Sequence, residues 1–335
     1  MKVKRGVRPR HLVAGVCVLV ALTSLTLRIR AGLARDALPA AIGAKTPAGS
    51  WTLPEPRDYV LYPEVAPGEE AHGPERIIAL APSVTETVCA LGLKDRLAGR
   101  TQFCQYPPII TSVPVVGGIM DTNLEMIRAL EPNLVLTTFN SGGLNPKLEA
   151  LGLRHVSVPH ESLEDVFVAI ERAGRFCDRP ATARQLAAAI RADLERLQRA
   201  ARALHDRPLR VLIVLGELPV PPATVWVAGP GSFLDDLLRM TGHRNAAADI
   251  LQTAHGEIPL ERLVVLDPEV ILTFPTVMPT PEDMNELYGS WSRVGAMQAI
   301  QQRRVRAVGG PEWLSAGPRI AVGLHRLLSA LAEYR

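Results

Sequence analysis

The sequence is poor in the features that mark most enzymes and metalloproteins. It has only four cysteines and no CxxC pair, which argues against a zinc cluster or a thioredoxin-type redox site. It also has no GxSxG nucleophile elbow, no Walker loop and no GxGxxG dinucleotide motif. No cluster of His, Asp and Glu indicates a site for a bare metal ion. These absences favour a binding protein over an enzyme.

An excess of charge of one sign is missing as well. The 37 Lys and Arg residues nearly balance the 34 Asp and Glu residues, and part of the net charge of +3 comes from the basic N-terminus. We therefore expect no nucleic-acid partner. Hydrophobic residues make up 47% of the 335-residue chain and charged residues 21%, which is enough apolar material for one large domain or two lobes.

An apolar run long enough to cross a bilayer is lacking, but a shorter run follows a basic start. The run from Leu12 to Leu27 falls short of the about 20 residues that a spanning helix needs. Five Lys or Arg residues lie before it, which is typical of a secretory signal. We therefore predict export to the periplasm or another extracytoplasmic compartment. No clean A-x-A cleavage site follows, so residues 1–34 are either a signal peptide or a retained N-terminal anchor.

The next stretch, residues 35–75, is rich in Pro, Ala, Gly and Glu and shows no sustained hydrophobic period. This composition predicts a linker between the leader and the folded part of the chain. A short ordered piece is expected near Trp51 to Tyr62.

The stretch 181–205, ATARQLAAAIRADLERLQRAARALH, predicts one long helix. Its apolar residues recur at spacings of three and four, and no Gly or Pro interrupts it. Pro180 and Pro208 bracket it. At 1.5 Å per residue the helix would be roughly 37 Å long, about the width of a small domain. We predict a bridge between two lobes over residues 179–206, and the alternative is an ordinary helix packed on one domain.

Short strands alternate with helices on both sides of this helix. The alternation predicts two α/β lobes with mostly parallel sheets, over residues 76–178 and 207–335. Residues 124–137 (LEMIRALEPNLVLT) align without gaps to residues 260–273 (LERLVVLDPEVILT), with six identities in fourteen positions. We interpret this as an internal duplication, although convergence on a helix–Pro–strand pattern is the alternative. Two Rossmann-like lobes predict a ligand site in the cleft between them.

Two helix starts have the form of a capping box. In Ser83-Val-Thr-Glu86 and in Thr122-Asn-Leu-Glu125 a hydroxyl residue is followed three positions later by glutamate. In a capping box the first side chain bonds the helix N-terminus and the glutamate reaches back. We therefore expect helices to begin at these two points.

Four segments carry a family resemblance: RIIALAPSVTETVCALGL (76–93), QYPP (105–108), VGGIMDTNLEMIRALEPNLVL (116–136) and AGPRI (316–320). In this order they resemble the periplasmic substrate-binding proteins of ABC importers for vitamin B12, haem and ferric siderophores, over about residues 76–330. The resemblance implies a type III periplasmic binding fold with small hinge motion. It also implies a monomer without enzymatic activity or cofactor. Such a protein captures a metal chelate, a corrinoid such as cobalamin first and a ferric siderophore or haem next, and delivers it to a membrane permease.

The resemblance also implies two docking carboxylates. In the vitamin B12 members one glutamate on each lobe docks to arginines of the permease, and by motif position these are Glu125 in NLEMI and Glu261 in PLERL. The duplication places the two residues at equivalent points. The alternative is that each is merely an acidic residue in a first helical turn, where the helix dipole favours it.

The cleft of the B12 binders is lined with aromatic side chains. Phe103 and Trp313 match aromatic positions, whereas Ile119 and His255 fall where the B12 type has tryptophan, which leaves another chelate open. His255 or His160 would be the axial ligand of a haem iron or cobalt, with a solvated loop histidine as the alternative. The predicted cleft residues, each with a core role as the alternative, are Ser83, Phe103, Ile119, Phe139, Glu217, Trp226, His255, Phe274, Trp313 and Arg319.

Two other functional classes stay open. One is an exported two-lobed α/β enzyme, such as a nitrogenase-like relative, and the other is a membrane-tethered sensor or scaffold that kept the fold without transport. The three cysteines outside the leader, Cys89, Cys104 and Cys177, all precede the second lobe, which argues against a cluster held between lobes. In an exported protein a disulfide between Cys89 and Cys104 is possible.

Overall fold

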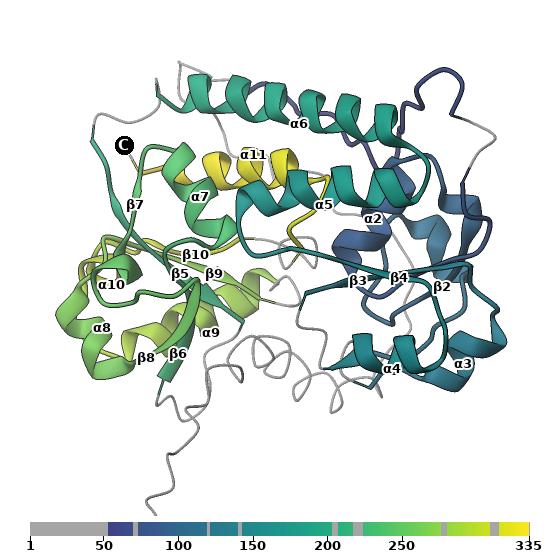
Figure 1. Ribbon diagram of the computed structural model, residues 1–335. Helices are drawn as coiled ribbons and strands as arrows, with labels where there is room; N and C mark the ends of the chain where they lie inside the picture. Colours follow the sequence, from purple (N-terminus) through teal and green to yellow (C-terminus); the bar gives the residue numbers. More distant parts are fainter. Residues whose placement is uncertain are drawn as a thin grey trace, which may run out of the picture.

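The computed structural model describes residues 53–69, 73–118, 121–139, 143–202, 207–216, 224–275, 280–308 and 315–334. They form two α/β lobes, each with its own sheet, and one long helix lies across both lobes along one side (Figure 1). The first lobe contains β1 (Ile77–Ala79), α2 (Pro82–Ala90), β2 (Leu97–Arg100), α3 (Leu124–Ala129), β3 (Leu134–Thr138), α4 (Leu144–Ala150), β4 (His155–Val158) and α5 (Leu163–Phe176). The long helix is α6 (Pro180–Ala201). The second lobe contains β5 (Arg210–Leu215), β6 (Thr224–Ala228), α7 (Phe233–Met240), β7 (Arg244–Asn245), β8 (His255–Pro259), α8 (Leu260–Leu266), β9 (Val270–Phe274), α9 (Pro281–Ser292), α10 (Gln298–Gln301), β10 (Val305–Ala307) and α11 (Ile320–Leu331).

The sheet of the first lobe is parallel throughout, with the strand order β2-β1-β3-β4. Its central strands β1 and β3 are buried along their whole length. Such strands appear in the sequence as continuous apolar runs, because helices cover both faces of a parallel sheet.

The sheet of the second lobe is mixed, with the order β10-β9-β5-β6-β8. Strands β5, β9 and β10 are parallel, but β6 runs antiparallel to both β5 and β8. The expected mostly parallel sheet therefore describes the first lobe and only part of the second. Trp226, one of the predicted cleft residues, lies inside β6.

The internal repeat is preserved in the backbone. In both lobes the repeated stretch forms a short helix followed by a buried strand, as α3–β3 and as α8–β9. Glu131 and Asp267, at equivalent positions, have φ values of 45° and 46°. Positive φ is uncommon for residues other than glycine. The same unusual conformation at the same point of both stretches supports an internal duplication.

Helix α6 joins the two lobes. It begins at Pro180, and its stripe of Leu186, Ile190, Leu194 and Leu197 is buried. The helix packs against α5 of the first lobe and α11 of the second. The predicted fold of two α/β lobes joined by one long helix is thus confirmed.

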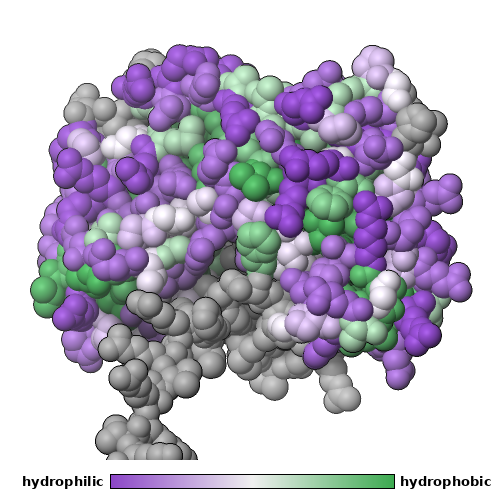
Figure 2. Space-filling model, in the orientation of Figure 1, coloured by the Kyte–Doolittle hydropathy of each residue, from purple (hydrophilic) through white to green (hydrophobic). Residues whose placement is uncertain are grey.

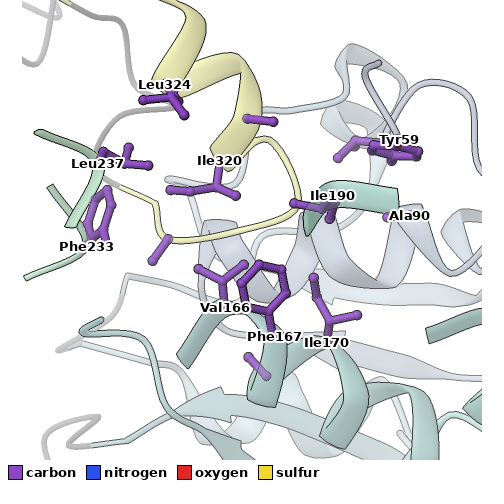
Figure 3. Packing of buried hydrophobic residues seen from close by; sticks show 14 of the residues in the cluster. Tyr59, Ala90, Val166, Phe167, Ile170, Ile190, Phe233, Leu237, Ile320 and Leu324 are labelled. Atoms are coloured by element: carbon purple, nitrogen blue, oxygen red, sulfur yellow. The ribbon is translucent and has the colours of Figure 1, made fainter. Parts of the chain in front are cut away.

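The main hydrophobic core runs through both lobes without a break. Figure 3 shows Val166 and Phe167 of α5, Leu237 of α7 and Ile320 of α11 gathered in one cluster with Ile190 of α6. Separating the lobes would expose this apolar surface to water, at about 25 cal/mol for each Å². The fold therefore opposes a wide opening of the lobes.

Residues 53–69, which we call the strap, lie against α6 instead of forming a free linker. The backbone N–H of Arg57 and the hydroxyl of Tyr59 donate hydrogen bonds to Asp193 in the middle of α6. Ordered structure was expected only near Trp51 to Tyr62, but it continues to Glu69. The contacts of the strap are tertiary and leave no periodic pattern in the sequence, which is why the composition indicates a linker.

Glu69 of the strap caps the bridging helix. Its carboxylate accepts hydrogen bonds from the backbone N–H groups of Ala181 and Thr182, at 2.8 and 2.9 Å, and from the Thr182 hydroxyl at 2.6 Å. Arg179, the residue before the helix, supplies no side-chain cap. Burial raises the pKa of Glu69, but the hydrogen bonds from Thr182 and Ala181 outweigh burial and lower the pKa overall.

Replacing this cap is expected to weaken the fold in a pH-dependent way. Glu69→Gln should cost about 1 kcal/mol at pH 7, because the helix N-terminus loses a charged acceptor. A carboxyl with a lowered folded-state pKa stabilises above its unfolded pKa, and this contribution is lost as the pH falls through the folded pKa. Urea unfolding at pH 7 and below pH 4 should show the gap between variant and wild type closing in acid. Glu75→Gln, at an exposed position, is the control, and equal stability of Glu69→Gln and wild type at pH 7 would refute the cap.

The cysteines of the first lobe are free thiols. Cys89, Cys104 and Cys177 are all buried and unpaired with one another, so the possible Cys89–Cys104 disulfide does not form. Burial raises the pKa of Cys89 to about 12. A buried thiol with so high a pKa is unreactive at neutral pH.

The predicted leader, residues 1–34, lies outside the described residues. Within the part of the chain that the structure describes, none of the helices is both long and apolar enough to span a bilayer.

Candidate functional site at the junction of the lobes

The two lobes meet at segments that follow strands of the first lobe. The segment after β4 crosses to the second lobe, where the backbone carbonyl of Glu161 accepts a hydrogen bond of 2.7 Å from the backbone N–H of Phe233. The backbone N–H of Leu163 donates to Asp236 of α7 at 3.0 Å. Ligand sites of α/β proteins form beyond the carboxyl ends of parallel strands. This junction is therefore the candidate binding region.

A buried ion pair joins the lobes across this junction. Arg319, next to α11, donates from Nε and Nη2 to the two carboxylate oxygens of Glu86 in α2, at 3.0 and 2.6 Å. The Tyr106 ring lies 3.8 Å from the guanidinium carbon, and its hydroxyl donates to Asp58 of the strap. Burial raises the pKa of Glu86, and the paired guanidinium opposes that rise. We call Asp58, Glu86, Tyr106 and Arg319 the junction network.

Arg319, predicted as a cleft residue, forms a contact between the lobes. Its side chain is 11% exposed, and two of its three nitrogens are bound to Glu86. The Ser83–Glu86 capping box is wrong, because α2 begins after Ala81 and no side chain caps it. Glu86 was missed as a functional residue, since the capping pattern explains the same glutamate locally. Its signal was an acidic side chain within an otherwise uncharged, buried helix.

Ser83 lies at the same contact. A β-carbon added to Gly317 of the second lobe would stand 3.3 Å from the Cα atom of Ser83. The backbones of α2 and of the chain before α11 therefore approach closely here, and a side chain at position 317 would need a shift of a few tenths of an ångström.

Two predicted histidines also come together at the junction. His160 follows β4 and His255 begins β8. Burial first, and then the nearby His160, lower the pKa of His255 to about 4. His255 is therefore neutral at pH 7, and the neutral imidazole is the form that coordinates a metal.

This lowered pKa predicts a pH-dependent stability. Between pH 6.5 and 4 the unfolded chain binds a proton at His255 that the folded protein does not, so stability falls as the pH falls through this window. His255→Asn should lose less stability than wild type between pH 6.5 and 4, in urea unfolding. His160→Asn should raise the pKa of His255 measured by NMR, because a neighbouring positive charge is gone. An unchanged pH dependence in His255→Asn would contradict the assignment.

The remaining predicted cleft residues differ in their surroundings. Phe103, after β2, and Trp226 are partly buried, whereas Phe139, after β3, is exposed and lies 5.8 Å from the Arg172 guanidinium carbon. Phe274 is corrected to a core residue, because it is 1% exposed and packs in the main cluster. Three further candidates lie outside the described residues: Ile119, Glu217 and Trp313.

Comparison with known proteins identifies the family to which this two-lobed chain belongs. The sequence pattern of the periplasmic binding protein family matches residues 77–310, well over half of the chain and parts of both lobes. The chain belongs to the periplasmic binding protein family. Its fold is the type III fold of that family, with two lobes and one bridging helix.

Relatives of this periplasmic binding protein are named as binding proteins, one of them of an ABC transporter. An uncharacterised ABC transporter substrate-binding lipoprotein of Bacillus subtilis is 28% identical over 77% of this chain and 80% of its own length. A vitamin B12-binding protein of Pectobacterium atrosepticum is 24% identical over 78% of this chain and 90% of its own. The solved structure of a periplasmic heme-binding protein from Roseiflexus sp. RS-1 has a TM-score of 0.67 and 25% identity, over 78% of this chain and 99% of its own.

The two predicted docking glutamates lie on the outer surface of this periplasmic binding protein. Glu125 in α3 and Glu261 in α8 are both exposed, and within the described ranges neither carboxylate forms an ion pair. Figure 1 shows α3 and α8 at opposite ends of the molecule, both on the side away from α6. The Thr122–Glu125 capping box is wrong, because Asn123 caps α3.

Apolar side chains accompany the glutamate of the second lobe. Val265, one turn after Glu261 on α8, is 86% exposed, and Val264 beside it is partly exposed. In Figure 2 apolar surface gathers at the end of the second lobe where Figure 1 draws α8. Met126, next to Glu125, is exposed on the first lobe.

Proposed function

We propose that this protein is the solute-binding component of an ABC importer, which captures a metal chelate between its lobes. The observation that carries the proposal is the family match across both lobes, in a chain whose strand-end segments meet at one junction. Enclosure between two lobes suits a bulky ligand, because both sides contribute surface. Export to an extracytoplasmic compartment, with residues 1–34 as signal or anchor, is part of the proposal.

We propose a corrinoid such as cobalamin as the first ligand class, and haem or a ferric siderophore as the next. Support for the corrinoid comes from relatives named for vitamin B12 binding. Support for haem comes from the Roseiflexus protein and from the neutral His255, whose free nitrogen suits an axial position on iron or cobalt. His160 is the second candidate for that position.

The ligand class is decided by an absorption spectrum and a titration. Protein purified from its native exported compartment should carry the visible band of a corrinoid, a haem or a ferric siderophore. Titration of the ligand-free protein with cyanocobalamin, haemin and a ferric hydroxamate should give a Kd of about 1 µM or tighter for one of them. His255→Asn should shift the visible band of a bound haem or corrinoid if its nitrogen ligates the metal. Failure of all three chelates to bind would favour the sensor or scaffold alternative.

The proposed partner is the membrane permease, and the proposed docking residues are Glu125 and Glu261. Both side chains are exposed, lack ion pairs within the described part of the chain and occupy equivalent points of the repeat. Arginine suits them, because its planar fork meets a carboxylate with two hydrogen bonds. We propose that one monomer docks both lobes at once.

A further inference from the structure

The junction network connects four segments that are far apart in the sequence. Glu86 and Arg319 are 233 residues apart, and Tyr106 and Asp58 are 48 residues apart. Glu86 comes from α2 and Tyr106 from the loop after β2, both in the first lobe, whereas Arg319 belongs to the second lobe and Asp58 to the strap. One continuous chain of contacts therefore runs from the strap through the first lobe to the second.

Stability alone does not explain a charged pair at this place. The side chains of Glu86 and Arg319 are 4% and 11% exposed, so both charges have lost most of their water. Desolvation offsets much of the attraction in such a pair, and apolar replacements of both partners are often neutral or stabilising. The apolar cluster around α5, α6 and α11 already holds the lobes together.

Unlike the apolar cluster, the junction network holds the two lobes by directional contacts. The hydrophobic effect is non-directional and depends on the apolar area that is buried. The two parallel hydrogen bonds from Arg319 to Glu86 instead fix both a distance and an angle between α2 and the start of α11. The Tyr106 ring covers the guanidinium, and Asp58 holds the Tyr106 hydroxyl. Gly317 approaches Ser83 closely beside this ion pair, so little room is left there for a change in the distance between the two lobes.

We propose that the junction network fixes the spacing and angle of the two lobes and so sets the width of the ligand site. Glu86, Arg319 and Tyr106 are then positioning residues, and none of them contacts the ligand. The link to the ligand site rests on the proposed function, whereas the effect on lobe spacing does not.

The test measures lobe spacing in the full chain without ligand. Spin labels are placed at Ala150→Cys of α4 and Gln301→Cys of α10, which are both exposed, in a Cys17→Ser background. Pulsed electron paramagnetic resonance between the two labels measures the distance between the lobes. The buried native thiols Cys89, Cys104 and Cys177 are shielded from the label. The variant is Glu86→Met/Arg319→Met, which removes the charges and their bonds together.

A matched control exists within the first half of the molecule. Arg191 of α6 lies 3.9 Å from the ring centre of Phe167 and 3.3 Å from Glu164, both of α5. An arginine here again contacts a glutamate and an aromatic ring, but the charged side chains are more exposed and do not link α2 to α11. Glu164→Met/Arg191→Met should leave the distance distribution unchanged. In Glu86→Met/Arg319→Met the distribution should broaden or shift. An unchanged distribution in that folded variant overturns the proposal.

The ligand readout separates this inference from the proposed function. Cyanocobalamin and haemin, titrated into the same variants, should bind Glu86→Met/Arg319→Met about tenfold more weakly, because fewer molecules hold the binding-competent spacing. If neither ligand binds wild type, the proposed ligand fails while the distance test still decides the role of the network. A changed distance with unchanged affinity would overturn the claim about the site width.

Tyr106 provides a second route if the methionine pair does not fold. Tyr106→Phe keeps the ring on Arg319 and loses only the bond to Asp58, whereas Tyr106→Ala exposes the guanidinium to water. The distance distribution should change more in Tyr106→Ala than in Tyr106→Phe. If the distance distributions of both variants equal that of the wild type, the positioning role is refuted.

Discussion

Replacing both Glu125 and Glu261 by alanine should reduce transport about a hundredfold and leave ligand affinity unchanged. Each exposed carboxylate would lose a charge-assisted bond to a permease arginine, worth about 1.4 kcal/mol or tenfold. The two sites lie at opposite ends of the molecule, so their effects should add. ATP-driven uptake in vesicles that contain the permease measures the first quantity, and titration with the ligand measures the second.

The control for docking is a pair of exposed glutamates elsewhere on the two lobes. Glu149→Ala/Glu286→Ala changes the net charge equally, through positions on α4 and α9. Uptake with this control should match wild type. Normal uptake by Glu125→Ala/Glu261→Ala, or loss of ligand binding instead, would mean that the two glutamates are only acidic residues in first helical turns.

Glu86→Ala should lower the free energy of unfolding by about 3 kcal/mol, because it leaves the guanidinium of Arg319 buried without a counter-charge. We expect the lower end of the range known for broken buried pairs, since Tyr106 still covers the cation. Urea unfolding followed by circular dichroism measures the loss.

The paired variant distinguishes lost charge from lost packing. Glu86→Met/Arg319→Met should unfold within about 1 kcal/mol of wild type, because no unpaired charge remains. Glu164→Ala breaks an ion pair of exposed side chains and should cost less than about 1 kcal/mol. Wild-type stability of Glu86→Ala would show that the pair is not the buried contact described here.

Elements with strong local patterns could be predicted. The bridging helix has an unbroken apolar stripe, and the parallel strands are continuous apolar runs, so the hydrophobic period alone identifies them. The antiparallel pairing of β6 and β8 was missed, because β8 reads HGEIP and has one buried residue in five. The strap was predicted only in part, as a short ordered piece near Trp51 to Tyr62, since its order comes from contacts with α6.

The candidate site could be predicted only in part. The motif resemblance and the repeat predict Glu125 and Glu261 at equivalent positions, and both are exposed in a first helical turn, whereas their role in docking stays a prediction. Phe274 follows the pattern of a cleft residue at a strand end, yet the second lobe closes over it. Burial depends on what the rest of the chain places on a side chain, and no local pattern records that.

The sequence by itself determined that this protein has two α/β lobes, one bridging helix and a family relationship, because periodicity, repeats and ordered motifs are local properties. Only the tertiary structure decided that Glu86 pairs with Arg319, that residues 53–69 form a strap, and that His160 and His255 are neighbours. These contacts join residues tens to hundreds of positions apart. Their energies depend on burial and on hydrogen-bond geometry, and both exist only after the lobes have packed together.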